Sequence, residues 1–159
     1  MRKLLLLTLA LATPALAEPA TPKPIPVSDP EAAIRACYAA LEKEQYGCDD
    51  SLPHSARLDA LFALDRKEAG GEVGRLDGNY FINGQDGRIT ASTVTSFPVD
   101  GSKSRRIVRV RFKNFDKPME NLFYWERNAA GRWVLDDVAA GGEDPFLLSI
   151  ALKYGWPAR

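Results

Sequence analysis

The chain has 159 residues, with 21 basic and 21 acidic side chains and a formal net charge of zero. Balanced charge provides no electrostatic footprint for nucleic acid and no polybasic patch for an anionic membrane. A domain of this size buries roughly two thirds of its unfolded surface and can fold without a metal, so we predict neither a nucleic-acid partner nor a cofactor.

The first 17 residues have the organisation of a secretory signal peptide. A positively charged start precedes an apolar run over residues 4–11, and Ala15-Leu16-Ala17 is a small-x-small cleavage site. The run is too short to cross a bilayer, and no second one follows. We therefore predict a periplasmic or secreted protein, cut after about Ala17, with no membrane span in its mature form.

Residues 18–28 contain four prolines and few side chains to bury, which predicts a flexible, extended lead-in. Residues 29–159 are predicted to form a single domain. Within it, Cys37 and Cys48 are an even pair in an oxidising compartment, which favours a disulfide over two separate buried thiols. One continuous helix would hold their Cα atoms about 16 Å apart, whereas a disulfide needs less than about 7 Å. The first helix must therefore end before Cys48.

Two helices are expected before any strand. The first starts at Asp29-Pro30, a capping side chain followed by proline, and stops by Gly47. The second covers residues 55–69 and ends at Gly70-Gly71. Helical spacing gives each an apolar face: Ile34, Cys37, Tyr38 and Leu41 in the first, and Leu58, Leu61 and Phe62, with Leu64 at the margin, in the second.

Residues 72–87 are rich in turn-forming residues, and their Tyr80-Phe81-Ile82 segment is predicted to pack into the core. After this stretch the spacing of apolar residues changes from the helical period to a period of two. Four strands separated by short turns predict an antiparallel meander. They cover residues 88–97, 105–115, 120–127 and 132–138. In the second strand Arg106, Val108, Val110 and Phe112 alternate with Arg109, Arg111 and Lys113.

A last helix is expected from Asp144-Pro145 to Gly155, with Leu147, Ile150, Ala151 and Tyr154 on its buried face. The predicted fold class is therefore α+β: a four-stranded curved antiparallel sheet packed against two N-terminal helices and one C-terminal helix.

Four features together resemble a known group of proteins. They are the helical N-terminal part, Gly84-Gln85-Asp86-Gly87, the meander that closes with Trp-Val-Leu-Asp-Asp-Val at residues 133–138, and the leucine-rich final helix. The chain resembles a family of secreted proteobacterial proteins with the nuclear-transport-factor-two-like or cystatin-like fold. Over residues 30–153 this implies a cone-like sheet around helices, with a pocket, but no particular activity, because the fold hosts enzymes, binding modules and scaffolds alike.

Asp136 and Asp137 are the candidate catalytic residues. As strand neighbours they should point to opposite faces, one toward water and one toward the helix-covered side. The resemblance implies that such an acid can act as a base in a pocket, assisted by Tyr38, Tyr80 or Tyr124. The alternative is an aspartate that caps a turn or pairs with an arginine of the neighbouring strand.

Candidate binding residues lie among the aromatic and basic side chains of the strands. Phe123, Tyr124, Trp125 and Trp133 predict core packing or, on an open face, a patch for a partner. Arg109, Arg111 and Lys113 indicate a solvated face paired with acids, or contact with an anionic partner.

The sequence gives little support to a metal site or a catalytic histidine. His54, the single histidine, follows Pro53 at a helix entrance and is expected to be an exposed loop residue. No zinc ligand set exists. The oxygen-rich stretch over residues 77–86 departs from a calcium loop, because Phe81 occupies a ligand position.

We therefore predict a non-catalytic periplasmic or secreted domain that binds a small molecule, a peptide or a protein. Two alternatives are a small pocket enzyme that uses an aspartate base with a tyrosine, and a secreted inhibitor or immunity protein.

Overall fold

A computed structural model describes residues 25–48, 51–142 and 144–155 of the chain. The predicted signal peptide and residues 18–24 of the lead-in lie outside the described residues. The described part is α+β, as predicted, with three helices and one open antiparallel sheet. In chain order the elements are α1 (Pro30–Leu41), α2 (Ala56–Ala69), β1 (Ile89–Pro98), β2 (Arg105–Asn114), β3 (Lys117–Arg127), β4 (Trp133–Ala140), β5 (Phe146–Leu147) and α3 (Leu148–Tyr154).

The sheet is a meander in which each strand pairs with the next, in the order β1-β2-β3-β4-β5. The predicted strands correspond to β1–β4, so the expected number of four was one too low. The extra strand, β5, pairs with Ala139 and Ala140 at the end of β4. Two residues are too few to produce an alternating pattern, which is why the sequence does not reveal this strand.

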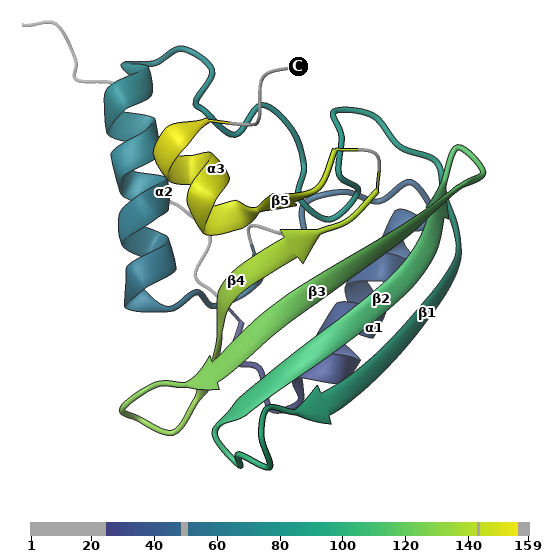
Figure 1. Cartoon of the computed structure of the whole chain (residues 1–159), viewed down its shortest axis with the longest axis vertical. Helices are drawn as coiled ribbons and strands as arrows, with labels where there is room; N and C mark the ends of the chain where they lie inside the picture. The colour runs from purple at the N-terminus through teal and green to yellow at the C-terminus, as the bar shows by residue number, and fades with distance from the viewer. Residues whose placement is uncertain (1–24, 49–50, 143, 156–159) are drawn as a thin grey trace, which may run out of the picture.

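One face of the sheet is buried under α1, which crosses behind β1–β3 in Figure 1. The alternation in β2 is confirmed: Val108 and Val110 have no exposed surface, whereas Arg111 between Val110 and Phe112 is exposed. Tyr38 of α1 packs on Phe112 with ring centroids 5.1 Å apart. The hydrophobic core therefore lies between α1 and this face, and it extends to Leu58 of α2 and Leu152 of α3.

The opposite face of β1–β3 is not covered by a helix in Figure 1. We call it the outer face. Ile107, Arg109 and Tyr124 belong to it, because each alternates with buried neighbours. Asp137 belongs to it as the partner of Tyr124 in the register. Helices α2 and α3 pack on each other and against β4, at one side of the sheet.

The start of α2 is attached directly to β4. The Leu135 amide donates to the Pro53 carbonyl, and the Ser55 amide donates to the Leu135 carbonyl, both at 2.8 Å. Ser55 then caps α2, because its hydroxyl accepts from the Leu58 amide at 3.1 Å. Of the predicted apolar face Leu58 is buried, whereas Leu64 is 38% exposed.

The predicted disulfide between Cys37 and Cys48 is present, with Cα atoms 5.6 Å apart. Helix α1 ends at Leu41, before Cys48, as the distance argument required. The chain then turns back through Glu44, which adopts the left-handed conformation with φ of 58°.

The predicted buried face of the last helix is confirmed at Ala151, which is 1% exposed, but is wrong at its other three positions. Ile150 and Tyr154 are 50% and 69% exposed, whereas Leu148 and Leu152 are buried. Because β5 precedes the helix, α3 begins at Leu148 rather than near Asp144, which changes the residues that face the core. In the described part of the chain, no helix has the length and apolar character to span a membrane.

Candidate binding site

A pocket of about 430 Å³ lies on the outer face. Ile107 of β2, Tyr124 of β3 and Asp137 of β4 are successive partners across the sheet and contribute to its floor. Its lining residues are Arg57, Val99, Arg105, Arg106, Ile107, Tyr124, Trp125, Glu126, Asp136, Asp137 and Leu147. The pocket lies on the side of the sheet that α1 leaves uncovered.

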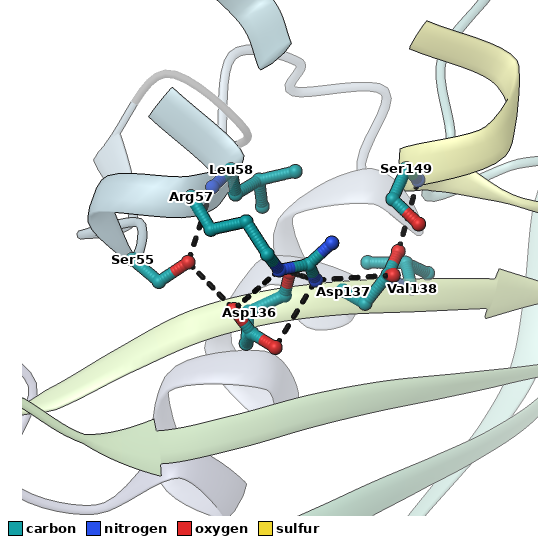
Figure 2. A network of polar contacts seen from close by, with 7 residues as sticks. All are labelled: Ser55, Arg57, Leu58, Asp136, Asp137, Val138 and Ser149. Carbon is teal, nitrogen blue, oxygen red and sulfur yellow. Dashed lines mark hydrogen bonds and ion pairs between the residues drawn. The ribbon is translucent and has the colours of Figure 1, made fainter. Parts of the chain in front are cut away.

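A β-bulge in β4 brings two acidic side chains to this pocket. Tyr124 pairs with Asp137 and Trp125 pairs with Leu135, so Asp136 is an extra residue with no partner in the β3–β4 register. The expectation that Asp136 and Asp137 point to opposite faces is therefore wrong. Both carboxylates contact the same guanidinium group, that of Arg57 (Figure 2).

Arg57 lies in the first turn of α2 and links that helix to β4. Its Nε and Nη2 atoms donate to Asp136 at 3.2 and 3.1 Å, and Nη2 also lies 3.2 Å from Asp137 Oδ2. Nη2 donates further to the Asp136 main-chain carbonyl at 2.6 Å. The arginine comes from a helix rather than from the neighbouring strand.

Asp137 connects three elements and is only 7% exposed. Its Oδ1 accepts from the Ser149 amide in the first turn of α3 at 3.0 Å and from the Val138 amide at 2.9 Å. Helix α3 has no side-chain cap of its own, because its capping residue is Leu147. The carboxylate therefore supplies the missing acceptor at the start of α3 and, through Arg57, holds α2 beside it.

Asp136 is held in its charged form. Partial burial opposes ionisation, but hydrogen bonds from Arg57 and from the Ser55 hydroxyl, at 2.6 Å, outweigh this and lower the pKa of Asp136 below its ordinary value. A carboxylate with a lowered pKa is a weak base near neutral pH.

This shift predicts an acid-sensitive contribution to stability. Because the pKa is lowered in the folded state, the ion pair stabilises the fold above the unfolded-state pKa, and the contribution is lost as the pH falls through the folded-state value. We expect Asp136→Asn to cost about 1–2 kcal/mol near pH 7 and much less near pH 2, measured by urea unfolding.

The matched control is Asp116→Asn. Asp116 lies at the same 3.1 Å from Arg88, but these side chains are 76% and 60% exposed, so little loss is expected at either pH. Equal pH dependence of the two variants would contradict the prediction.

The predicted aromatic contact residues are distributed between the core and the outer face. Tyr38, Tyr80, Trp125 and Trp133 are all at most 5% exposed, which places their side chains in the core. The open aromatic patch that was considered is therefore absent from the described surface at these positions. Burial also raises the pKa of Tyr38. Tyr124 is half-buried and lines the pocket together with Asp136 and Asp137.

Arg109 and Arg111 lie on the outer side of β2 and pair with an acid. Glu120 of β3 accepts a hydrogen bond from Arg111 at 2.7 Å and lies 3.8 Å from Arg109. The Arg109 guanidinium also lies 5.2 Å from the centre of the Phe97 ring. These contacts match the interpretation of a solvated basic face paired with acids opposite.

His54 is not the exposed loop residue that was expected. Its side chain is 15% exposed, stacks on Phe62 with centroids 5.2 Å apart, and lies 3.3 Å from Asp59. The bridge between the His54 segment and Leu135 explains the burial, because it draws this segment against β4. Within the described residues no group of three or more His, Cys, Asp or Glu is arranged to hold a metal ion.

Arg57 is the site residue that sequence reasoning missed. Its partners are 79 and 80 positions away in the chain, so no local pattern points to them. One weak signal existed: a cation in the first turn of a helix is disfavoured by the helix dipole and needs a compensating partner.

Comparisons with protein-family models, curated proteins and solved structures found no match. The function is therefore argued from the site itself.

Proposed function

We propose that the protein is an exported, non-catalytic binding domain that holds a small molecule in the pocket on the outer face. The observation that carries the proposal is the pocket itself, whose volume of about 430 Å³ falls within the roughly 300–1,000 Å³ of known ligand pockets. The pocket also combines apolar lining, from residues such as Ile107 and Leu147, with charged side chains that can orient a ligand, and this combination is found in ligand sites.

Export is supported by three features. The first 17 residues have signal-peptide organisation, and a Cys37–Cys48 disulfide is compatible with an oxidising compartment outside the cytosol. The resemblance to the secreted proteobacterial family supports the same localisation.

Binding is favoured over catalysis by the state of the two aspartates. Both carboxylates accept hydrogen bonds from Arg57, and the lowered pKa of Asp136 makes it a poor proton acceptor at neutral pH. The enzyme alternative, with Asp136 or Asp137 as base and Tyr124 assisting, draws support from the presence of all three in one pocket. An inhibitor or immunity protein would instead use the surface of the outer face.

The test is a screen of small-molecule fragments against the mature protein by amide NMR spectroscopy. We expect hits that shift the amide signals of Ile107, Tyr124 and Leu147, and we expect Ile107→Glu to abolish these shifts. Val73→Glu, at a loop residue that is 73% exposed, is the control and should leave them unchanged. Hits that move only amides outside the pocket would overturn the proposal.

A further inference from the structure

Arg57 retains hydrogen-bonding capacity toward a ligand. Its side chain is 49% exposed and lines the pocket. The Nε and Nη2 atoms are engaged by the two aspartates, whereas Nη1 has no hydrogen-bond partner among the described residues. Figure 2 shows one guanidinium nitrogen turned away from both carboxylates, without a dashed line. A guanidinium nitrogen of this kind carries two N–H donors and no acceptor.

The charge of Arg57 is nevertheless more than balanced. Asp136 and Asp137 both approach its Nη2 atom within 3.2 Å. Among the other lining residues, Arg105 of β2, whose charge helps to lower the pKa of Asp136, stands opposite Glu126 of β3 in the register. These five side chains carry a formal excess of one negative charge. A ligand at Nη1 would therefore find N–H donors for hydrogen bonds, but no excess positive charge around them.

The remaining lining arginine does not alter this balance at Arg57. Arg106 alternates with Ile107 and belongs to the other face of β2, where its guanidinium carbon lies 5.7 Å from the centre of the buried Trp133 ring. The pocket also has apolar lining, because Ile107, Tyr124 and Leu147 contribute to it.

From this arrangement we infer that the pocket selects ligands with an apolar body and a neutral hydrogen-bond acceptor, such as an amide carbonyl, over ligands that carry a carboxylate. The carbonyl accepts from Arg57 Nη1, and the apolar body rests on Ile107 and Tyr124. A carboxylate at the same position is repelled by Asp136 and Asp137 and loses its hydration without gaining an uncompensated cation. The inference rests on the proposed binding function and specifies its ligand class.

The test compares 3-phenylpropanamide with 3-phenylpropanoate, which share an apolar body and differ in the charge of the terminal group. Each is titrated into the mature protein while the amide signals of Ile107 and Tyr124 are followed. We expect the amide to bind with a dissociation constant on the order of 1 mM, typical of a small fragment. We expect the carboxylate to bind about tenfold more weakly.

Asp136→Asn tests the effect of the negative charge, because this variant should gain affinity for the carboxylate ligand rather than lose it. The asparagine keeps an oxygen that can accept from Ser55 and Arg57, but it removes one negative charge. The affinity for 3-phenylpropanoate should therefore rise several-fold, and the ratio of the affinities for the amide and the carboxylate should fall. Asp116→Asn, which removes the same charge from the Arg88 pair, should leave the preference unchanged.

The outcomes separate this inference from the function on which it rests. The inferred selectivity would be overturned if the Ile107 and Tyr124 signals showed equal affinity for the two probes or tighter binding of the carboxylate. Either result would still support a ligand pocket. An unchanged preference in Asp136→Asn would overturn the charge argument. If neither probe moves these signals, the inferred ligand class is wrong, and the fragment screen decides separately whether the pocket binds any small molecule.

Discussion

Replacement of Asn121 by alanine is expected to lower the free energy of unfolding by about 3–4 kcal/mol. Asn121 has no exposed surface. Its Nδ2 atom donates to the carbonyls of Phe81 and Tyr80 at 2.9 and 3.1 Å and lies 3.1 Å from the Tyr38 hydroxyl. Alanine would remove a donor from two buried carbonyls and leave a cavity, and both effects destabilise.

The network around Asn121 joins three parts of the fold. It connects β3 to α1 through Tyr38 and to the turn that places Tyr80, Phe81 and Ile82 in the core. The Tyr38 hydroxyl also donates to the Phe81 carbonyl at 2.7 Å. Because these groups share partners, Tyr38→Phe and Asn121→Ala should be coupled rather than additive in a double-mutant cycle.

Asn114→Ala is the matched control for Asn121→Ala. Asn114 of β2 also bonds the same turn, through the Ile82 carbonyl at 3.1 Å, but it is only half-buried. Water can replace its lost bonds, so we expect a cost of about 1 kcal/mol. Urea unfolding measures both variants, and equal losses would contradict the argument from burial.

Removal of the Cys37–Cys48 disulfide is the second large effect. Its cysteines are 11 residues apart, and the entropy of closing such a loop in the unfolded chain corresponds to about 3 kcal/mol. For a chain of this size that is roughly 10 °C in melting temperature. Scanning calorimetry of the protein with and without reductant should show the decrease.

The double variant with Cys37→Ala and Cys48→Ala separates the disulfide from other effects of the reductant. Its melting temperature should be low already and should not respond to reductant. An unchanged melting temperature of the wild type on reduction, together with two thiols that alkylate freely without reductant, would overturn the assignment. The buried position of Cys37, 2% exposed, predicts slow alkylation even after reduction unless the chain opens.

The strands show which side-chain directions can be predicted from the sequence and which cannot. The alternation in β2 correctly identifies which residues face the core, because side chains of a strand alternate between its two faces. The same rule fails at Asp136, since the bulge adds one residue to β4 and changes the alternation at that point. No local pattern in β4 indicates a bulge, which depends on pairing with β3.

By itself, the sequence determined the fold class, the four long strands and their meander order, the starts of α1 and α2, and the disulfide. Each depends on residues that are close in the chain or on a repeating pattern of hydrophobicity. Only the tertiary structure decided the short strand β5, the buried face of α3, and the meeting of Arg57 with Asp136 and Asp137. These features depend on the path that brings the start of α2 to β4, and contacts between residues some 80 positions apart leave no local periodicity to detect.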